Sequence, residues 1–545
     1  MDGLMQRIPL TIVDIFEHAE RMHGHKEIVT RGPSPSRYTY SDWARRVRQL
    51  GTAIESFGLD PDARLATFCW NHAQHLELYY AVPCTGRVLH TLNIRLFADQ
   101  LEYIVNHADD QVIFADRSLL GTLLPILEKT PGVKKVVVID DGSGPQVLDG
   151  DRFVDYEQLI ADCAPADFSI DDENRAAAMC YTSGTTGNPK GVVYSHRSTY
   201  LHAMMMTSTM TVALDESDRP MVIVPMFHAN AWGMPYAAPM CGASLIFPAS
   251  DMSPAGVAQT IQDEKVTLAM GVPTIWQGLL PLMDDYDLSS LRALASGGSA
   301  VPRALIKEYR ERLGVHMFQG WGMTETSPIG SMGRYGAREK AMPVEEFLDL
   351  ASTAGHIVAG VRARIVEPGT SIEQPWDGTS TGELQVKGPW VARDYFKPEK
   401  PGALSTEDGW MQSGDIAAIG PGGLLRIVDR TKDLVKSGGE WISSVEIENV
   451  LMGHPDVREA AIVGVTHPKW TERPLACVVL KDGVAASEAK KQELRDYLAP
   501  QIARWWMPDA VEFIDEVPKT SVGKFSKKDL RQKYAGYALP DVHQS

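Results

Sequence analysis

Two patterns of apolar positions alternate along the first 430 or so residues of the chain. Residues 111–115 and 134–140 are short apolar runs with the length of buried strands, and residues 119–129 between them have helical spacing. A strand, a crossover helix and a second strand form the repeating unit of a parallel sheet. The pattern therefore predicts a largely parallel, buried α/β sheet, followed at residues 360–386 by a β-rich stretch that turn residues interrupt.

The last hundred or so residues have a different, shorter rhythm of helices and strands. Helices are predicted at residues 445–452, 488–498 and 527–534, the last of them basic, and strands at residues 460–465, 475–480 and 510–513. This part of the chain is therefore expected to form a small α+β module.

Charge and composition narrow the classes of function. The chain has 545 residues, with 53 Lys and Arg against 70 Asp and Glu, so its formal net charge is −17. An acidic surface argues against broad binding to nucleic acid or to anionic lipid. It does not exclude a phosphate-bearing substrate, which a few well-placed basic groups can bind.

Targeting and redox signals are sparse. The apolar runs are far shorter than a membrane-spanning helix needs, and Asp2, Arg7, Pro9 and Asp14 interrupt the N-terminus, so no signal peptide is predicted. Six scattered cysteines form no C-x-x-C pair, which favours reduced thiols over a disulfide framework. A cytoplasmic location is the simplest expectation.

A loop rich in glycine and hydroxyl groups at residues 181–191 is the strongest chemical signal. It follows a predicted strand at residues 176–180, its glycines allow backbone N–H groups to converge on an anion, and its single lysine adds a positive charge. The residues concerned are Thr182, Ser183, Gly184, Thr185, Thr186, Gly187, Lys190 and Gly191. The loop is not a Walker A motif, because Pro189 precedes the lysine and strand-like residues follow it. The alternative is an ordinary polar turn.

A second glycine-rich segment matches a hydrolase motif only superficially. Residues 378–382 read G-T-S-T-G, the pattern of a nucleophile elbow, which requires a strand before the serine and a helix after it. Here a turn precedes Ser380 and a predicted strand at residues 383–386 follows it, so we interpret Ser380 as a turn residue.

Several segments together resemble the superfamily of adenylate-forming enzymes, which comprises acyl-CoA synthetases, adenylation domains and firefly luciferases. The matching segments lie at residues 181–191, 296–302, 321–325, 413–415 and 518–528, and the resemblance covers nearly the whole chain in order. Residues 227–238 resemble fatty acyl-CoA synthetases, and overall similarity favours their 3-methylmercaptopropionate–CoA ligase branch.

The resemblance implies a fold and a division of the chain. We expect an α/β protein with a large N-terminal domain at residues 1–430, made of layered α/β subdomains plus a β-barrel-like part. A hinge at residues 431–433 would connect it to a small, mobile α+β C-terminal domain at residues 434–545.

The nucleotide contacts that the resemblance implies come from several motifs. Thr324 would contact the α-phosphate, Glu325 and Thr185 would hold Mg²⁺, and Asp415 and Arg430 would contact the ribose. Read singly, Glu325 could be a helix-start carboxylate, and Asp415 and Arg430 could be surface charges. The remaining ATP or AMP contacts implied are Gly298, Ser299, Ala300, Gly320, Trp321, Gly322 and Met323, besides Thr182, Ser183, Gly184, Thr186, Gly187 and Lys190 of the loop above.

Lys524 and Lys432 carry the catalytic expectations in the C-terminal region. By resemblance Lys524 is the catalytic lysine, and a cation suits this role because carboxylate attack on an α-phosphate brings two anions together. Lys432 is the position about which the C-terminal domain would rotate between adenylation and thioester formation. The lysines that flank Lys524 are more simply a solvated helix face.

The remaining candidates concern the acyl group and CoA. His228 would lie beside the carboxylate as a third catalytic residue, and the acyl pocket would be formed by His228, Trp232, Gly298 and Pro302. After rotation, CoA would contact Lys436, Gly438, Gly439, Glu440, Trp441 and Glu472, although Trp441 alone could be a packing residue.

These expectations predict an ATP-dependent, AMP-forming acyl-CoA ligase that uses Mg²⁺ and CoA. We expect 3-methylmercaptopropionate or a short- or medium-chain fatty acid as substrate, with long-chain acids as the alternative, and a homodimer. Three other functions stay open at this point: an enzyme that loads a carrier protein, a luciferase-like oxygenase, and a non-catalytic nucleotide sensor.

Overall fold

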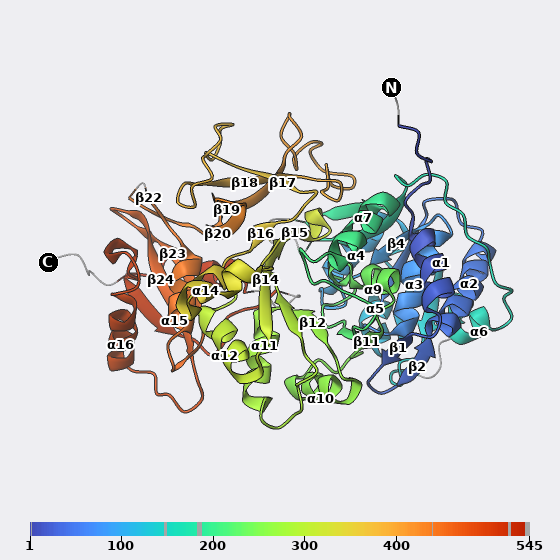
Figure 1. Cartoon of the computed structure of the whole chain (residues 1–545), viewed down its shortest axis with the longest axis horizontal. Coiled ribbons are helices and arrows are strands. Elements are labelled where there is room, and N and C mark those ends of the chain that lie inside the picture. Colours follow the sequence, from blue (N-terminus) through green and yellow to red (C-terminus); the bar gives the residue numbers. More distant parts are fainter. Residues whose placement is uncertain (2, 146–149, 183–187, 439, 521–524, 540–545) are drawn as a thin grey trace.

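The computed structural model describes residues 1–545 except 2, 146–149, 183–187, 439, 521–524 and 540–545. Figure 1 shows the chain as a large N-terminal part, coloured from blue through yellow to light orange, and a small dark-orange-to-red C-terminal part at its side. Among the described residues, no helix combines the length and apolar character needed to cross a bilayer. All six cysteines are free, and four of them are buried.

A seven-stranded sheet in the order β7-β6-β5-β3-β4-β8-β9 forms one layer of the large part. Its pairs are parallel except β8 with β9. The parallel sheet predicted from the apolar runs is therefore confirmed. The strands are β3 (Arg64–Phe68), β4 (Val88–Thr91), β5 (Asp110–Asp116), β6 (Lys135–Ile139), β7 (Phe153–Asp155), β8 (Ala176–Tyr181) and β9 (Gly191–Ser195).

A thirteen-stranded sheet forms the second layer, in the order β17-β18-β19-β20-β16-β15-β14-β13-β12-β10-β11-β1-β2. Strands β10 to β14 pair in parallel, whereas β14 to β20 pair antiparallel. The strands are β1 (Glu27–Thr30), β2 (Ser36–Thr39), β10 (Pro220–Met221), β11 (Leu245–Phe247), β12 (Leu268–Gly271), β13 (Ala293–Ser296), β14 (His316–Gly322), β15 (Ile329–Met332), β16 (His356–Ile357), β17 (Arg362–Val366), β18 (Thr381–Lys387), β19 (Met411–Gly420) and β20 (Leu424–Arg430).

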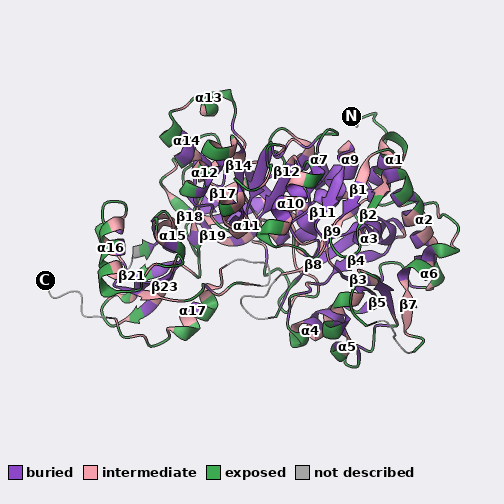
Figure 2. Ribbon diagram, turned by 90° about the horizontal axis from the view of Figure 1, so that it is seen from below, coloured by how far each residue is buried: buried purple, intermediate pink, exposed green. Residues whose placement is uncertain are grey.

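Helices cover the sheets and join them into one core. The largest buried cluster takes residues from both sheets and from α1, α2, α3, α7 and α9, and Figure 2 shows buried residues running through the centre while outer helices expose one face. The helices of the large part are α1 (Ile12–His23), α2 (Tyr40–Ser56), α3 (Ala73–Cys84), α4 (Ala98–Ala108), α5 (Leu120–Leu127), α6 (Tyr156–Ala161), α7 (His196–Thr207), α8 (Ala229–Trp232), α9 (Met234–Cys241), α10 (Pro254–Glu264), α11 (Pro273–Leu279), α12 (Arg303–Leu313), α13 (Ala337–Lys340) and α14 (Val344–Ala351).

The small C-terminal part is built on a five-stranded sheet, in which β22, β21, β24 and β23 pair in that order and β25 pairs with β24. Its elements are β21 (Val435–Ser437), β22 (Glu440–Ile442), α15 (Ser444–Met452), β23 (Val457–His467), β24 (Thr471–Leu480), α16 (Glu488–Leu498), β25 (Ala510–Phe513) and α17 (Lys527–Lys533). The predicted α+β module is confirmed, and the strand predictions at residues 460–465 and 475–480 fall inside longer strands.

The G-x-S-x-G segment lies in a turn, as the sequence predicts. Gly378 has a φ of +82°, and the Ser380 N–H donates a 2.6 Å hydrogen bond to the Asp377 carboxylate. Strand β18 begins one residue later, at Thr381. No helix follows the serine, so the geometry of a nucleophile elbow is absent from this described segment.

Candidate functional site

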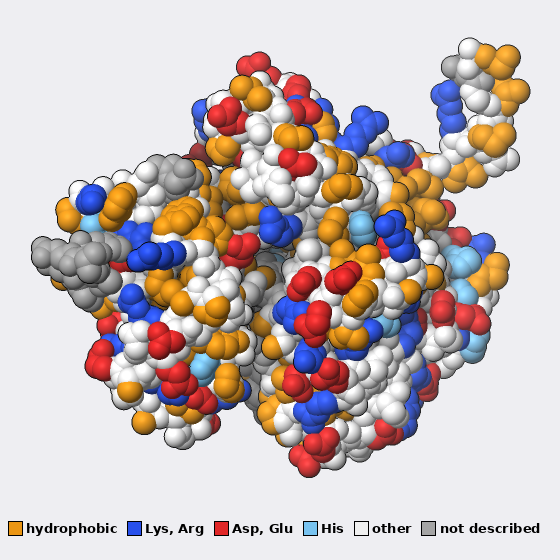
Figure 3. All heavy atoms as spheres, turned by 60° about the vertical axis from the view of Figure 1, so that its left-hand side comes forward, with side chains coloured by type: hydrophobic (Ala, Val, Ile, Leu, Met, Phe, Trp, Pro, Cys, Tyr) orange, Lys and Arg blue, Asp and Glu red, His pale blue; other side chains and the backbone are white. Residues whose placement is uncertain are grey.

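A cavity of about 850 Å³ lies between the large and the small part. It opens at the carboxyl ends of β12, β13 and β14, the usual place for a ligand in a parallel α/β sheet. Figure 3 shows the surface hollowed between two lobes. The cavity brings together these residues predicted for the site: Thr182, Lys190, His228, Trp232, Gly298, Ser299, Ala300, Pro302, Gly320, Trp321, Gly322, Met323, Thr324, Glu325, Asp415, Arg430 and Lys432.

Asp415 and Arg430 form an ion pair on the cavity wall. They are register partners on the antiparallel strands β19 and β20, and Arg430 Nε lies 2.9 Å from Asp415 Oδ1. The Trp321 indole N–H donates to Asp415 Oδ2 at 2.8 Å, and the Asp415 charge raises the pKa of Arg430. The ion pair and the indole together hold the buried carboxylate in one orientation, with both residues facing the cavity.

The Ser413 hydroxyl connects the backbone of Asp415 to the neighbouring strand β18. Its Oγ donates to the Leu384 carbonyl at 2.7 Å and accepts the Asp415 N–H at 3.1 Å. A threonine at this position would offer the same hydroxyl, so these hydrogen bonds do not require a serine.

Glu325 is a buried carboxylate at the end of the β14 segment. It is only 5% exposed, and Tyr395 donates its hydroxyl to Glu325 Oε1 at 2.7 Å. Burial and the Glu325 charge raise the pKa of Tyr395, so the phenol keeps its proton and remains a donor. Lys190 Nζ lies 4.8 Å from the centre of the Tyr395 ring, which brings the lysine of the 181–191 loop toward the same carboxylate.

Tyr395 is a site residue that the sequence reasoning missed. It lies 70 positions from Glu325 along the chain, in an irregular segment before β19. Neither hydrophobic periodicity nor a local motif connects the two residues. Tyr194, whose hydroxyl donates to the Thr324 carbonyl at 2.8 Å, was missed for the same reason.

His228 precedes, and Trp232 ends, an unusual backbone turn on the cavity wall. The four residues of α8, from Ala229 to Trp232, all have φ between +44° and +54°, a left-handed conformation that costs a non-glycine residue about 1–2 kcal/mol. Asn230 anchors the turn, because its buried side-chain oxygen accepts from Tyr79 Oη at 3.4 Å and from Cys180 Sγ at 3.3 Å. The Trp232 indole lies against Gly297, where a Cβ would meet the ring at 3.3 Å.

The two predicted catalytic loops are only partly described. Ser183, Gly184, Thr185, Thr186, Gly187 and Lys524 lie outside the described residues. The residues on either side of each loop are described. The Thr182 N–H donates to the Lys190 carbonyl at 2.9 Å across the first loop, and Lys519 and Phe525 form a β-bridge across the second. Phe525 and Lys432 line the cavity from the C-terminal side.

Among the described residues predicted to contact CoA, Lys436, Gly438, Trp441 and Glu472 lie on or beside the small sheet and are not among the residues that line this cavity. The Lys436 ammonium lies 5.1 Å from the centre of the Trp441 ring, and the Lys436 N–H donates to the Glu472 carboxylate at 2.9 Å. Gly438 has a φ of +62°, and a Cβ there would meet the Trp470 ring at 2.7 Å. Gly439 lies outside the described residues, and Glu440 begins β22.

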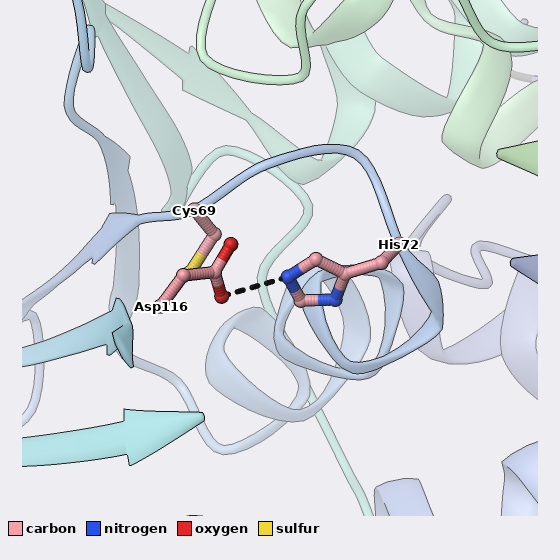
Figure 4. Close-up of side chains that lie close together, drawn as sticks. All are labelled: Cys69, His72 and Asp116. Carbon is pink, nitrogen blue, oxygen red and sulfur yellow. Dashed lines mark hydrogen bonds and ion pairs between the residues drawn. The ribbon is translucent and has the colours of Figure 1, made fainter. Parts of the chain in front are cut away.

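A buried group of potential metal ligands lies elsewhere, at the carboxyl ends of β3 and β5. Figure 4 shows Cys69, His72 and Asp116, whose ligand atoms lie within 4.8 Å of one another. Asp116 accepts the His72 Nε2–H at 2.8 Å and the Trp70 N–H at 2.7 Å, and Cys69 donates to the Phe114 carbonyl. These hydrogen bonds connect the loop after β3 with the end of β5, which is a structural role.

Comparison with known families identifies both parts of the chain. Residues 16–396 match the model of the AMP-binding enzyme family, and residues 446–524 match the C-terminal domain of AMP-binding enzymes.

Three curated relatives are each 41% identical over almost the whole chain. They are 3-methylmercaptopropionyl-CoA ligase of Ruegeria lacuscaerulensis (98% of this chain, 99% of the relative), medium-chain-fatty-acid–CoA ligase of Ectopseudomonas oleovorans (99% and 98%) and long-chain-fatty-acid–CoA ligase of Thermus thermophilus (97% and 96%). Among solved structures, ATP-bound MatB from Rhodopseudomonas palustris superposes with a TM-score of 0.82 at 26% identity, covering 96% of this chain and 99% of that one. The predicted fold class is thereby confirmed.

Proposed function

The chain belongs to the AMP-binding enzyme family, and from this premise we propose that it is an ATP-dependent, AMP-forming acyl-CoA ligase. It would convert a carboxylate, ATP and CoA to an acyl-CoA, AMP and diphosphate by way of an acyl-adenylate. The curated relatives, which are similar to this chain over nearly their full length, bear the names of acyl-CoA ligases. This supports ligase activity over a carrier-loading enzyme, an oxygenase or a sensor.

The observation that carries the proposal is the composition of one cavity. The Asp415–Arg430 pair, the Glu325 carboxylate and Thr324 line it together with His228 and Trp232. Asp415 has two oxygens that can accept both ribose hydroxyls. A nucleotide bound there would place its α-phosphate near Thr324, with an acyl group toward Trp232. Adenylate formation requires that two reactants be held side by side in one cavity.

The donor set supports Mg²⁺ as the metal of this reaction. Mg²⁺ prefers oxygen ligands and is typically bound by one or two carboxylates plus substrate phosphates. Glu325 supplies such a carboxylate on the cavity wall, and Tyr395 holds its Oε1 by a hydrogen bond. Bound Mg²⁺ would neutralise phosphate charge. Glu325 would hold the ion, and Tyr395 would keep the Glu325 carboxylate in position.

Lys524 is proposed as the cation that joins the carboxylate to the α-phosphate in the first half-reaction. A lysine there stabilises charge that develops on the phosphate oxygens. We expect Lys524→Ala to abolish acyl-adenylate formation, measured by pyrophosphate release, and to spare most of the thioester formation from a supplied acyl-adenylate. Equal loss of both half-reactions would contradict this role.

The second half-reaction is proposed to follow a rotation of residues 434–545 about the hinge at residues 431–433, with Lys432 as pivot. The small sheet begins at Val435, immediately after this segment, which supports the division. The surface formed by Lys436, Trp441 and Glu472 would then face the acyl-adenylate and bind CoA. Trp441→Ala should raise the KM for CoA and leave pyrophosphate release unchanged; a change confined to pyrophosphate release would contradict the assignment.

The acyl substrate is proposed to be 3-methylmercaptopropionate or a short- to medium-chain fatty acid. Relatives with short, medium and long substrates in their names are equally identical to this chain, so identity alone does not separate the chain lengths. A panel of carboxylic acids in a pyrophosphate-release assay tests the proposal. Turnover of long-chain acids alone would contradict it.

A homodimer and a cytoplasmic location complete the proposal. The free cysteines fit a reducing compartment. Sedimentation velocity at micromolar concentration tests the dimer, and a species at the monomer mass of 60.0 kDa would contradict it.

A further inference from the structure

The end of strand β20 contacts the start of helix α15, and this contact crosses from the large part to the small part. Asp429, which is only 1% exposed, accepts the Ser444 N–H at 2.7 Å and the Ser444 hydroxyl through the same Oδ2. The neighbouring Ser443 hydroxyl donates to the Val428 carbonyl at 2.7 Å. A strand of one part therefore supplies the anion at the helix N-terminus of the other, where the unpaired N–H groups and the helix dipole favour negative charge.

Lys527 joins the same contact from helix α17. Its buried ammonium lies 2.7 Å from Glu448 Oε1 and donates to Ser444 Oγ. Burial alone would lower the pKa of Lys527, but the charges of Glu448 and Asp429 outweigh it and raise the pKa, so the ammonium stays charged. Glu448 is in turn fixed to β23, because it accepts the Ile462 N–H at 2.7 Å.

Asp429 also reaches the nucleotide side of the cavity. Its second oxygen, Oδ1, accepts the Arg430 N–H at 2.7 Å, and Arg430 pairs with Asp415. Asp429, Glu448 and Lys527 line the cavity beside these residues. One carboxylate thus connects the backbone of a candidate ribose contact with the helix and the lysine of the small part.

We infer that Asp429, Ser444 and Lys527 form a docking latch that holds the small part against the large part in the arrangement for adenylation. They are positioning residues, and Lys527 stands three positions after the proposed catalytic residue Lys524 in the sequence. The latch must open before the small part can rotate for thioester formation. Its groups are charged or polar and gain water when they separate, so opening costs far less than exposing an apolar interface of the same size.

The role in catalysis rests on the proposed function, whereas the contact itself can be tested without any substrate. In hydrogen exchange of the free, full-length protein, Asp429→Asn should reduce the protection of the Ser444 amide at least tenfold, because an amide oxygen is a weaker acceptor than a carboxylate. Ser444→Ala, which keeps the N–H donor, should reduce the protection of residues 443–446 less. Unchanged exchange in both variants would overturn the latch.

The two half-reactions test its function. Asp429→Asn and Ser444→Ala should slow pyrophosphate release about tenfold, and thioester formation from a supplied acyl-adenylate should stay the same or become faster. The control is Lys528→Gln, which removes a positive charge at an exposed position of α17, next to Lys527, and should change neither step. Equal slowing of both half-reactions, or no slowing of either, would overturn the latch. Absence of ligase activity in the unaltered protein with every acid would instead refute the proposed function, while the exchange experiment would still decide the contact.

Discussion

The two parts of the molecule hold their walls of the cavity by different forces. In the large part, Ser296 and Trp321 lie at the ends of β13 and β14 and Asp415 lies in the middle of β19, and these strands contribute to the main apolar core. In the small part the residues that face the cavity are held by buried charges, with Lys527 paired to Glu448. An apolar core deforms little. Lys527 and Glu448 both belong to the small part, so their ion pair moves with it, and the polar contact that crosses to the large part is the hydrogen bond from Ser444 to Asp429, which can open and be rehydrated. The fixed wall therefore suits nucleotide binding, and the polar wall suits a part that moves.

The largest effect is expected when a buried charge inside the small part is removed. Arg473, 5% exposed, pairs with Asp509 at 2.8 Å and donates to the Trp505 and Met507 carbonyls. Arg473→Met leaves Asp509 without its cation, so we expect a loss of about 3–5 kcal/mol in the unfolding free energy of the small part. Urea unfolding should then show a separate early transition for the small part.

The control for this change is Arg458→Met. Arg458 pairs on the surface with Asp482, which is 99% exposed, so its removal should cost less than about 0.5 kcal/mol. A single shared transition with equal shifts in both variants would show that the small part does not depend on its buried charges.

The second prediction concerns the fixed wall. Asp415→Asn removes a carboxylate that holds Arg430 and faces the cavity, so we expect kcat/KM for ATP to fall about 100-fold, a loss of about 2–3 kcal/mol of charge-assisted hydrogen bonding. The fold should persist, because the Trp321 indole can still donate to the amide oxygen. Steady-state kinetics measure the effect, and Asp284→Asn, at an 88% exposed position, is the control. An ATP dependence equal to that of the control would remove Asp415 from the site.

The third prediction concerns the pH dependence of the stability of the large part. Burial lowers the pKa of His75 and His202 to about 3 and that of His196 to about 4, all in the large part. Because these values lie below the unfolded value of about 6.5, the unfolded chain binds the extra protons, and stability falls as the pH falls below 6.5. Each histidine should cost about 1 kcal/mol between pH 7.5 and 5.5. Urea midpoints of the large-part transition at these two pH values measure the loss, and an unchanged midpoint would contradict it.

The smallest expected effect is at the false nucleophile. Ser380 is a half-buried turn residue whose hydroxyl donates to Asp377 at 2.8 Å. Ser380→Ala should change stability by no more than about 0.5 kcal/mol and should leave ligase activity unchanged. A loss of activity comparable to that of Asp415→Asn would mean that the elbow motif had been dismissed wrongly.

The sequence pattern predicted an element or a site residue correctly where the residues that define it are close together along the chain. The strands β5 and β6 with α5 between them follow from periodicity, and helix α16 and strand β25 were predicted with the bounds that the structure has. Candidate residues such as Asp415 and Thr324 were identified by matched motifs, and the cavity collects both. Tyr395 and Asp429 were missed, because their importance lies in partners that are distant along the chain: Glu325 for the first, and Ser444 for the second.

The amino-acid sequence alone determined the strands and helices of residues 111–140 and 445–534, the parallel character of the first sheet, and the motif residues of an adenylate-forming enzyme. These follow from side-chain periodicity and short-range spacing, which are properties of the linear sequence and do not depend on how the chain folds. Only the tertiary structure decided which carboxylates became buried and which residues form hydrogen bonds or ion pairs with them. Asp429 next to Arg430 is an ordinary pair of surface charges in the sequence, and it became a link between the two parts because folding placed a helix N-terminus and a buried lysine beside it. The energy of a charge depends on burial and on neighbours, and both are properties of the folded molecule.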